Sequence, residues 1–118
     1  MHRSKNLRNL ESTLSLKIRN VYQKQLEHQI QHISYKLFDR TLMITLEGII
    51  TSPEKLLKEN ERFDLMQQMR TVLDDVVHLQ IQTVIEETLN VKIVDYLSDT
   101  KIDNDISGAI AILEFKPK

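Results

Sequence analysis

Cysteine is absent from this 118-residue chain, and glycine and proline occur only twice each. Without cysteine, the chain cannot form a disulfide or a thiolate zinc site, and nothing in it argues for an oxidising compartment. Two glycines are too few to build a glycine-rich loop around a phosphate. The charged start, residues 1–7, is not followed by an apolar run, so we expect no signal peptide.

Long apolar runs are also missing, because no segment reaches the roughly 18 apolar residues that span a bilayer. We therefore expect a cytoplasmic protein without membrane insertion, whose membrane role, if it has one, is peripheral to the inner face. Hydrophobic residues make up 41% and charged residues 28% of the chain, as in ordinary globular proteins. The length fits one domain. We predict a single domain over residues 1–118, with residues 1–8 as a candidate disordered N-terminal arm.

The net charge of −1 is unevenly distributed along the chain. Residues 1–40 hold eight Lys or Arg against three Asp or Glu, a balance of +5, whereas residues 41–118 hold eight against fourteen, a balance of −6. A nucleic-acid-binding protein usually concentrates its basic side chains on one face, with aromatic or Arg platforms. Here they are spaced along a predicted helix, so we interpret them as a solvated face and expect no nucleic-acid partner.

Periodicity over residues 7–50 predicts a helix followed by a hairpin. Apolar residues recur every three or four positions over Leu7–Leu26, as in an amphipathic helix. Apolar and polar residues then alternate over Ile33–Phe38 and Thr41–Ile50, which predicts two strands joined by a turn at Asp39-Arg40. We interpret Gly48, near the end of the second strand, as a requirement of the backbone.

A second helix is predicted to begin at Thr51-Ser52-Pro53-Glu54, because a hydroxyl cap, a proline and an acid all favour helix initiation. The three- and four-residue spacing of apolar residues continues to Leu89, with a candidate break near Asn60. Asn90 can end this central helix, since asparagine tolerates the left-handed conformation.

Two more strands are predicted in the last part of the chain, over Val91–Leu97 and Ala109–Phe115. The polar segment Asp99–Ser107 between them is typical of a turn. The predicted fold class is α+β, in the order helix-strand-strand-helix-strand-strand. We expect a four-stranded, mainly antiparallel sheet packed with a long central helix and an N-terminal helix.

Such a sheet raises the question of what covers its second face. The predicted strands Leu42–Ile50 and Ala109–Phe115 are apolar on both sides, and two helices can cover one face but not both. A bare apolar face would exceed the patch that monomers usually expose, so we predict a homo-oligomer, most simply a two-fold dimer. The competing arrangement places the N-terminal helix on one face and the central helix on the other, which leaves a monomer.

An acidic motif near the end of the chain matches an EF-hand calcium loop. Asp103, Asp105, Ser107 and Glu114 stand at its first, third, fifth and twelfth positions. An EF-hand also needs a helix that leaves the loop, whereas the following residues are typical of a strand and Pro117 opposes a helix. We therefore reject calcium in favour of an acidic hairpin turn, and expect no metal site.

Three histidines are candidates for chemistry. His28 and His32 are four residues apart, a spacing used for metal ligands on a helix, but they have no evident third ligand and fall where the first helix ends. We interpret them as part of a polar connection. His78 lies within the central helix, where an exposed pair with Asp74 explains it.

Paired carboxylates occur at Asp74-Asp75 and Glu86-Glu87. Adjacent helical residues diverge by about 100° and cannot converge on one substrate atom, so these pairs are interpreted as a solvated face. No serine or threonine stands in a nucleophile elbow. We therefore predict no catalytic residue and no cofactor, and expect that the protein is not an enzyme.

One candidate binding site is left open. The free amides at the helix start that includes Thr51, Ser52 and Glu54 could hold an anion, with Arg70 nearby. The alternative is a plain helix cap. The site gives the second functional hypothesis, a dimeric module that senses a small molecule or anion.

The segment from Leu46 to Leu57, Arg70, and the segment from Val91 to Asp99 together resemble the MpsC-like family, small bacterial proteins named after a sodium-translocating membrane-potential-generating system. The resemblance covers about residues 10–115. It implies an accessory or regulatory subunit that contacts a membrane ion or bicarbonate-type transport protein, and it supplies no catalytic residue. The chain departs from the family pattern at Asn90, where relatives usually carry glycine, and in its acidic final turn.

Overall fold

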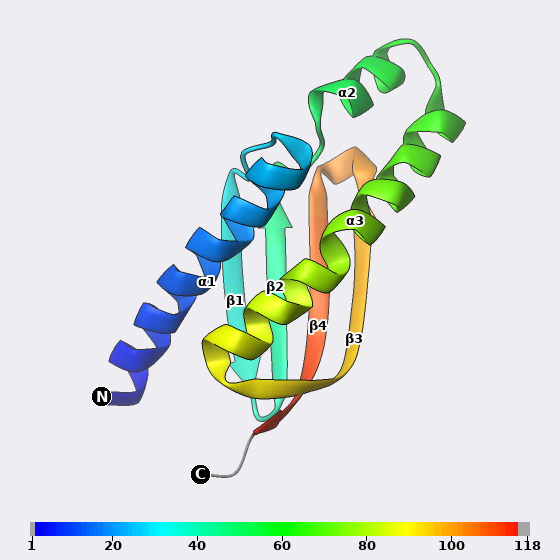
Figure 1. The fold of residues 1–118 in the computed structure, drawn as a ribbon. Helices are drawn as coiled ribbons and strands as arrows, with labels where there is room; N and C mark the ends of the chain where they lie inside the picture. Colours follow the sequence, from blue (N-terminus) through cyan, green and yellow to red (C-terminus); the bar gives the residue numbers. More distant parts are fainter. Residues whose placement is uncertain (1, 116–118) are drawn as a thin grey trace.

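Figure 1 shows a computed structural model of the chain, which describes residues 2–115 and, for residues 2–8, the backbone alone. The helices are α1 (His2–Leu26), α2 (Ser52–Glu59) and α3 (Phe63–Leu89), and the strands are β1 (His32–Phe38), β2 (Thr41–Glu47), β3 (Val91–Lys101) and β4 (Ile106–Phe115). The strands form one antiparallel sheet in the order β1-β2-β4-β3. The predicted α+β fold, with its N-terminal and long central helices, is confirmed.

The helix boundaries follow the local signals in the sequence. Thr51 is the N-cap of α2 and has extended backbone angles, and Asn90 ends α3 at a left-handed φ of 54°. The break predicted near Asn60 separates α2 from α3. At the other end of the chain, α1 begins at His2, so its backbone includes residues 2–8, the segment considered above as an arm.

Three strand boundaries differ from the prediction by three or four residues, and β1 begins one residue earlier than predicted, at His32. β2 ends at Glu47 rather than Ile50, because Gly48 turns the chain away with a φ of +72°. β3 continues to Lys101, and β4 begins at Ile106, so the predicted turn over Asp99–Ser107 is wrong at both ends. The ladder continues through these polar residues because strand pairing uses backbone groups, and β3 lies at the sheet edge, where polar side chains can stay in water.

Both long helices lie on the same face of the sheet (Figure 1), and α1 packs against α3. The helix-covered side holds the core, in which buried apolar side chains come from both helices and from the inner strands: Leu14, Ile18, Tyr22, Leu42, Ile44, Leu46, Val77, Ile81, Ile85, Ala111 and Leu113. The competing arrangement, with one helix on each face, is therefore wrong. Within the described residues no helix covers the second face.

The helix pair α2–α3 extends past the end of the sheet where β2 finishes (Figure 1). The molecule is accordingly elongated, with extents of 53 × 24 × 23 Å. This end of the sheet, where the 3-10 turn Ile102–Asn104 also lies, is where polar residues enter the interior.

Candidate functional site

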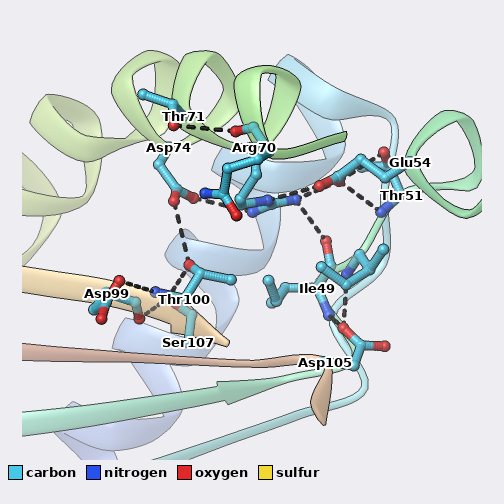
Figure 2. A network of polar contacts seen from close by, with 12 residues as sticks. Ile49, Thr51, Glu54, Arg70, Thr71, Asp74, Asp99, Thr100, Asp105 and Ser107 are labelled. Carbon is cyan, nitrogen blue, oxygen red and sulfur yellow. Dashed lines mark hydrogen bonds and ion pairs between the residues drawn. The ribbon is translucent and has the colours of Figure 1, made fainter. Parts of the chain in front are cut away.

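The candidate site begins with the segment that leaves β2 (Figure 2). Asp105 binds this segment from the β3–β4 turn: its carboxylate Oδ1 accepts hydrogen bonds from the backbone amides of Ile49 and Ile50 at 2.7 and 2.8 Å. Its own carbonyl accepts the amide of Gly48 at 3.0 Å. One aspartate therefore satisfies three successive amides, which fixes the path of the chain into α2.

Glu54 lies in the first turn of α2 and is completely buried. Its Oε1 accepts hydrogen bonds from the amide of Thr51 at 3.0 Å and from the Thr51 hydroxyl at 2.9 Å. An acid three residues after a hydroxyl N-cap commonly reaches back in this way, because the first amides of a helix lack partners within the helix. The local sequence therefore explains the first half of the site.

Arg70, one of the largest fully buried side chains, provides the second half from α3. Its Nε and Nη2 donate to the two carboxylate oxygens of Glu54 at 2.8 and 2.5 Å, the bidentate geometry that suits a guanidinium. Nη2 also donates to the carbonyl of Ile49 at 3.3 Å, and Nη1 donates to Asp74 at 3.0 Å. All three nitrogens of the guanidinium are bonded within the chain.

The network continues from Asp74 to the edge of the sheet. The hydroxyl of Thr100 on β3 donates to Asp74 at 3.2 Å and lies 3.1 Å from the hydroxyl oxygen of Ser107 on β4. The Ser107 hydroxyl donates to the carbonyl of Asp99 at 3.2 Å. Side chains from α2, α3, β3 and β4 thus form one connected cluster, which we call the Arg70 cluster: Thr51, Glu54, Arg70, Asp74, Thr100 and Ser107.

The cluster shifts the pKa values of its acids in opposite directions. Burial by itself would raise the pKa of Glu54, but the hydrogen bonds from Arg70 and Thr51 outweigh it and hold the pKa below its ordinary value. The pKa of Asp74 is raised because burial outweighs the attraction of Arg70. The pKa of Arg70 is raised because its bonds to Glu54 outweigh its burial. Glu54 and Arg70 are therefore a charged pair at neutral pH.

The structure brings together three of the four residues proposed for an anion site: Thr51, Glu54 and Arg70. Ser52 is exposed, and the hydrogen bonds that join the cluster run between other residues. The carboxylate of Glu54 already occupies the guanidinium of Arg70 and the amide of Thr51. An external anion would have to displace Glu54 and leave it buried and unpaired, which is costly. The arrangement is suited to holding α2, α3 and the sheet edge together.

The four calcium candidates are distributed along β4 and the turn before it. Asp103 lies in the 3-10 turn, Asp105 is bonded to the β2–α2 segment, and Ser107 faces the Arg70 cluster. Glu114 pairs with Lys92 in the register of the ladder, at the opposite end of β4 from Ser107. The seven residue steps along β4 from Ser107 to Glu114 span about 23 Å, too far for one ion. In residues 9–115, whose side chains the structure describes, no group of three or more His, Asp or Glu could hold a metal ion.

Of the three histidines considered above, His32 is the first residue of β1, so its assignment to the polar connection is wrong, and the other two have structural partners. His28 lies between α1 and β1, as predicted for a polar connection, and its Nε2 is 2.6 Å from the carbonyl oxygen of Gly48. The predicted exposed pair of His78 with Asp74 is wrong. His78 is half-buried and packs edge-on against Tyr96, with the ring centroids 4.7 Å apart, while Asp74 binds Arg70 and Thr100.

The interpretation of Asp74 as a solvated residue is also wrong, as is that of Glu86, whose carboxylate accepts the amide of Ile93 at 2.9 Å. Their neighbours Asp75 and Glu87 are exposed, as the interpretation of a solvated face requires. The sequence contained one signal for Asp74, since it follows Arg70 by four residues, a spacing that places two helical side chains side by side. Asp105 and Thr100 had no such local signal, because their partners are distant in the sequence.

Beside the Arg70 cluster, an open polar groove runs between α3 and β3. Its lining includes Gln67, Thr71, Asp75, His78 and Tyr96. Burial raises the pKa of Tyr96 to about 12, so its hydroxyl stays protonated at neutral pH. In the adjoining cluster, the hydroxyls of Thr51 and Thr100 donate to the carboxylates of Glu54 and Asp74, and both carboxylates are also bonded to Arg70.

Comparison with known protein families gives a match over nearly the whole chain. The family described as "Na+-translocating membrane potential-generating system (MpsC)" matches residues 6–115. No curated protein and no solved structure matches the chain. None of the helices in residues 2–115 has an apolar stretch long enough to cross a bilayer.

Proposed function

The chain belongs to the MpsC family, and from this premise we propose that it is an accessory or regulatory protein, rather than an enzyme, that acts through protein contacts. Its partner is a protein of a membrane ion or bicarbonate transport assembly that generates membrane potential. In this proposal the chain works in the cytoplasm, at the inner face of the membrane.

The observation that carries the proposal is an exposed apolar stripe along α3, formed by Leu65, Val72, Val76 and Leu79. These side chains are between 40% and 70% exposed. Their spacing of seven, four and three residues places them on one side of the helix. The opposite side of α3 carries the buried residues Met66, Arg70, Val77, Ile81 and Ile85. The helix therefore has two apolar sides, and only one is used within the fold.

The charges on α3 indicate what kind of partner fits the stripe. The helix contains no lysine, and its one arginine is buried in the cluster. The exposed charged residues of α3 are Asp64, Asp75 and Glu87, which are all acidic. A complementary partner is a helix with an apolar ridge flanked by Lys or Arg, because apolar burial supplies affinity and opposite charge supplies orientation. Basic segments are common on the cytoplasmic side of membrane proteins.

The Arg70 cluster supports a structural rather than a catalytic contribution to this role. Its arginine and both of its acids are bonded within the chain. A fully bonded network holds α2 and the start of α3 in place, and it therefore holds the stripe in a fixed position.

The experiment is affinity purification of the tagged chain at native expression, with Val72→Lys plus Leu79→Lys as the test variant. We expect the wild-type chain to recover membrane transport subunits, and the variant to lose them because it replaces apolar contacts by repelling charges. Gln67→Lys plus Thr71→Lys is the matched control, since it adds the same charge at exposed positions of α3 outside the stripe. Recovery of soluble proteins alone, or equal loss in both variants, would contradict the proposal.

A further inference from the structure

In residues 2–115, no helix covers the face of the sheet away from α1 and α3, and the side chains on this face follow a regular pattern. Because side chains alternate along a strand, the residues between the buried positions of each strand share this face. The register aligns them in rows across β1, β2, β4 and β3: Phe38, Thr41, Ile112 and Asp95; Lys36, Met43, Ile110 and Leu97; Ser34, Thr45, Gly108 and Asp99; His32, Glu47, Ile106 and Lys101. We call this surface the open face.

The open face is apolar at its centre. Met43 and Leu97 are 45% and 58% exposed, and Ile110, between them in the same row, is half-buried. Phe38 at the end of β1 and Val94 at the β3 bulge extend the exposed apolar surface to both edges. Soluble monomers seldom leave such a contiguous surface in water.

Gly108 is a second, independent feature of this face. It lies inside β4, between Thr45 and Asp99 in the ladder, where glycine weakens a strand. Its backbone does not have a positive φ, and a Cβ added there meets no heavy atom of the described residues within 4 Å. The fold of one chain therefore does not require glycine at this position. A glycine inside a strand is often found where another backbone approaches closely.

The charges on the two edges of the open face are complementary. Lys36 is exposed on β1, and Asp95 and Asp99 are exposed on β3. A two-fold axis parallel to the strands, placed between two facing sheets, sets β1 of one copy over β3 of the other. Lys36 then lies over Leu97 of the second copy, between Asp95 and Asp99 of that copy. The same operation sets Met43 over Ile110 and Thr45 over Gly108.

We propose that a second copy of this chain covers the open face, so that the two sheets pack face to face about a two-fold axis with Lys36 of each copy between Asp95 and Asp99 of the other. Facing sheets normally pack about 10 Å apart, and Gly108 allows this approach at the level of Thr45. The proposal goes beyond the proposed function, because it names another partner and uses the face opposite the α3 stripe. Both surfaces can be occupied at once.

The experiment is analytical ultracentrifugation of the purified full chain at micromolar concentration. We expect a mass near twice 13.9 kDa for the wild type. Gly108→Val adds a side chain where the two sheets come close together, so it should weaken the dimer at least about tenfold. The melting temperature of the variant monomer should equal or exceed that of the wild-type monomer, since valine favours strands. This combination separates loss of the interface from loss of the fold.

A charge exchange tests the pairing of the edges. Lys36→Glu should weaken the dimer at least about tenfold, because it places like charges opposite each other. Adding Asp95→Lys and Asp99→Lys to the same chain should restore the dimer. A wild-type mass near 13.9 kDa, a dimer that survives both Gly108→Val and Lys36→Glu, or a charge exchange without rescue would each overturn the proposal. Because only the purified chain is used, the result does not depend on whether a membrane partner is found.

Discussion

The two ends of the core are built differently. At the end where α2 begins, the interior contains the buried ion pair of Glu54 and Arg70, which belongs to a hydrogen-bonded network from Thr51 to Ser107. At the other end, where α3 finishes and β3 begins, the buried residues are apolar, as at Ile85, Val91 and Leu113. Directional bonds therefore fix the position of α2 and the start of α3, whereas nondirectional burial holds the rest. The stability that the ion pair contributes depends on pH and on both charged partners, whereas the stability from apolar burial depends on how well the side chains fit together.

The largest expected effect is at Arg70, because its removal leaves Glu54 buried without a partner. We expect Arg70→Met to lower the free energy of unfolding by about 3–5 kcal/mol, measured by urea denaturation. The control is the double variant Arg70→Met with Glu54→Gln, which should lose clearly less than the sum of the two single losses. Additive losses would mean that the two groups do not act as a pair.

At the apolar end, Leu113→Ala removes a side chain that is 0% exposed. We expect a loss of about 2–5 kcal/mol, from lost burial and the cavity that remains. Because no ionisable group is removed, the loss should be the same at pH 5 and pH 7. A strong pH dependence of this loss would contradict the distinction between the two ends.

Glu54→Gln tests the pH dependence of the polar end. We expect a loss of about 2 kcal/mol at neutral pH, as for other hydrogen bonds to charged groups. The pKa of Glu54 is lowered in the folded state, so its stabilisation is complete above its ordinary pKa and is lost as the pH falls through the folded value. The difference in unfolding free energy between wild type and variant should therefore shrink in acid.

Asp74 has the opposite effect on the pH dependence of stability. Its pKa is raised in the folded state, which favours proton uptake by the folded state as the pH falls. Its contribution is present in both proteins and largely cancels from the comparison. A difference between wild type and Glu54→Gln that grows in acid would contradict the charged pair.

The two glycines give a smaller, matched comparison. Gly48 has a φ of +72°, and a Cβ there would collide with the side chain of Gln31. We expect Gly48→Ala to cost about 1–2 kcal/mol. Gly108→Ala, at an unstrained position, should leave the thermal unfolding of the monomer unchanged or raise its midpoint. Equal losses in both variants would show that the conformation at Gly48 is not the cause.

The smallest expected effect concerns ligands. Because Glu54 already occupies Arg70, phosphate, sulfate, bicarbonate and nucleotides should leave the melting temperature unchanged in a thermal-shift screen. Glu54→Gln is the informative second sample, since it removes the internal anion. Stabilisation of the wild type by one of these anions would revive the anion-sensing hypothesis.

Much of the fold was predictable because its signals are local. The N-cap at Thr51, the left-handed end of α3 at Asn90 and the alternation in β1 each depend on a few neighbouring residues. The errors arose where pairing overrides local composition, as in the polar part of β3, whose backbone pairs with β4 regardless of its side chains. For the site, the sequence placed Glu54 at a helix start but could not reveal that Arg70 neutralises it.

The sequence by itself determined the order and type of the elements, because periodicity and capping act within one or two turns of chain. Only the tertiary structure decided that β4 lies between β2 and β3, and that both long helices cover one face. It also decided that Asp105 binds the amides of Ile49 and Ile50, which lie more than fifty residues earlier. Such contacts form between segments that are distant along the chain, and their free energy appears only when the whole core closes and brings them together.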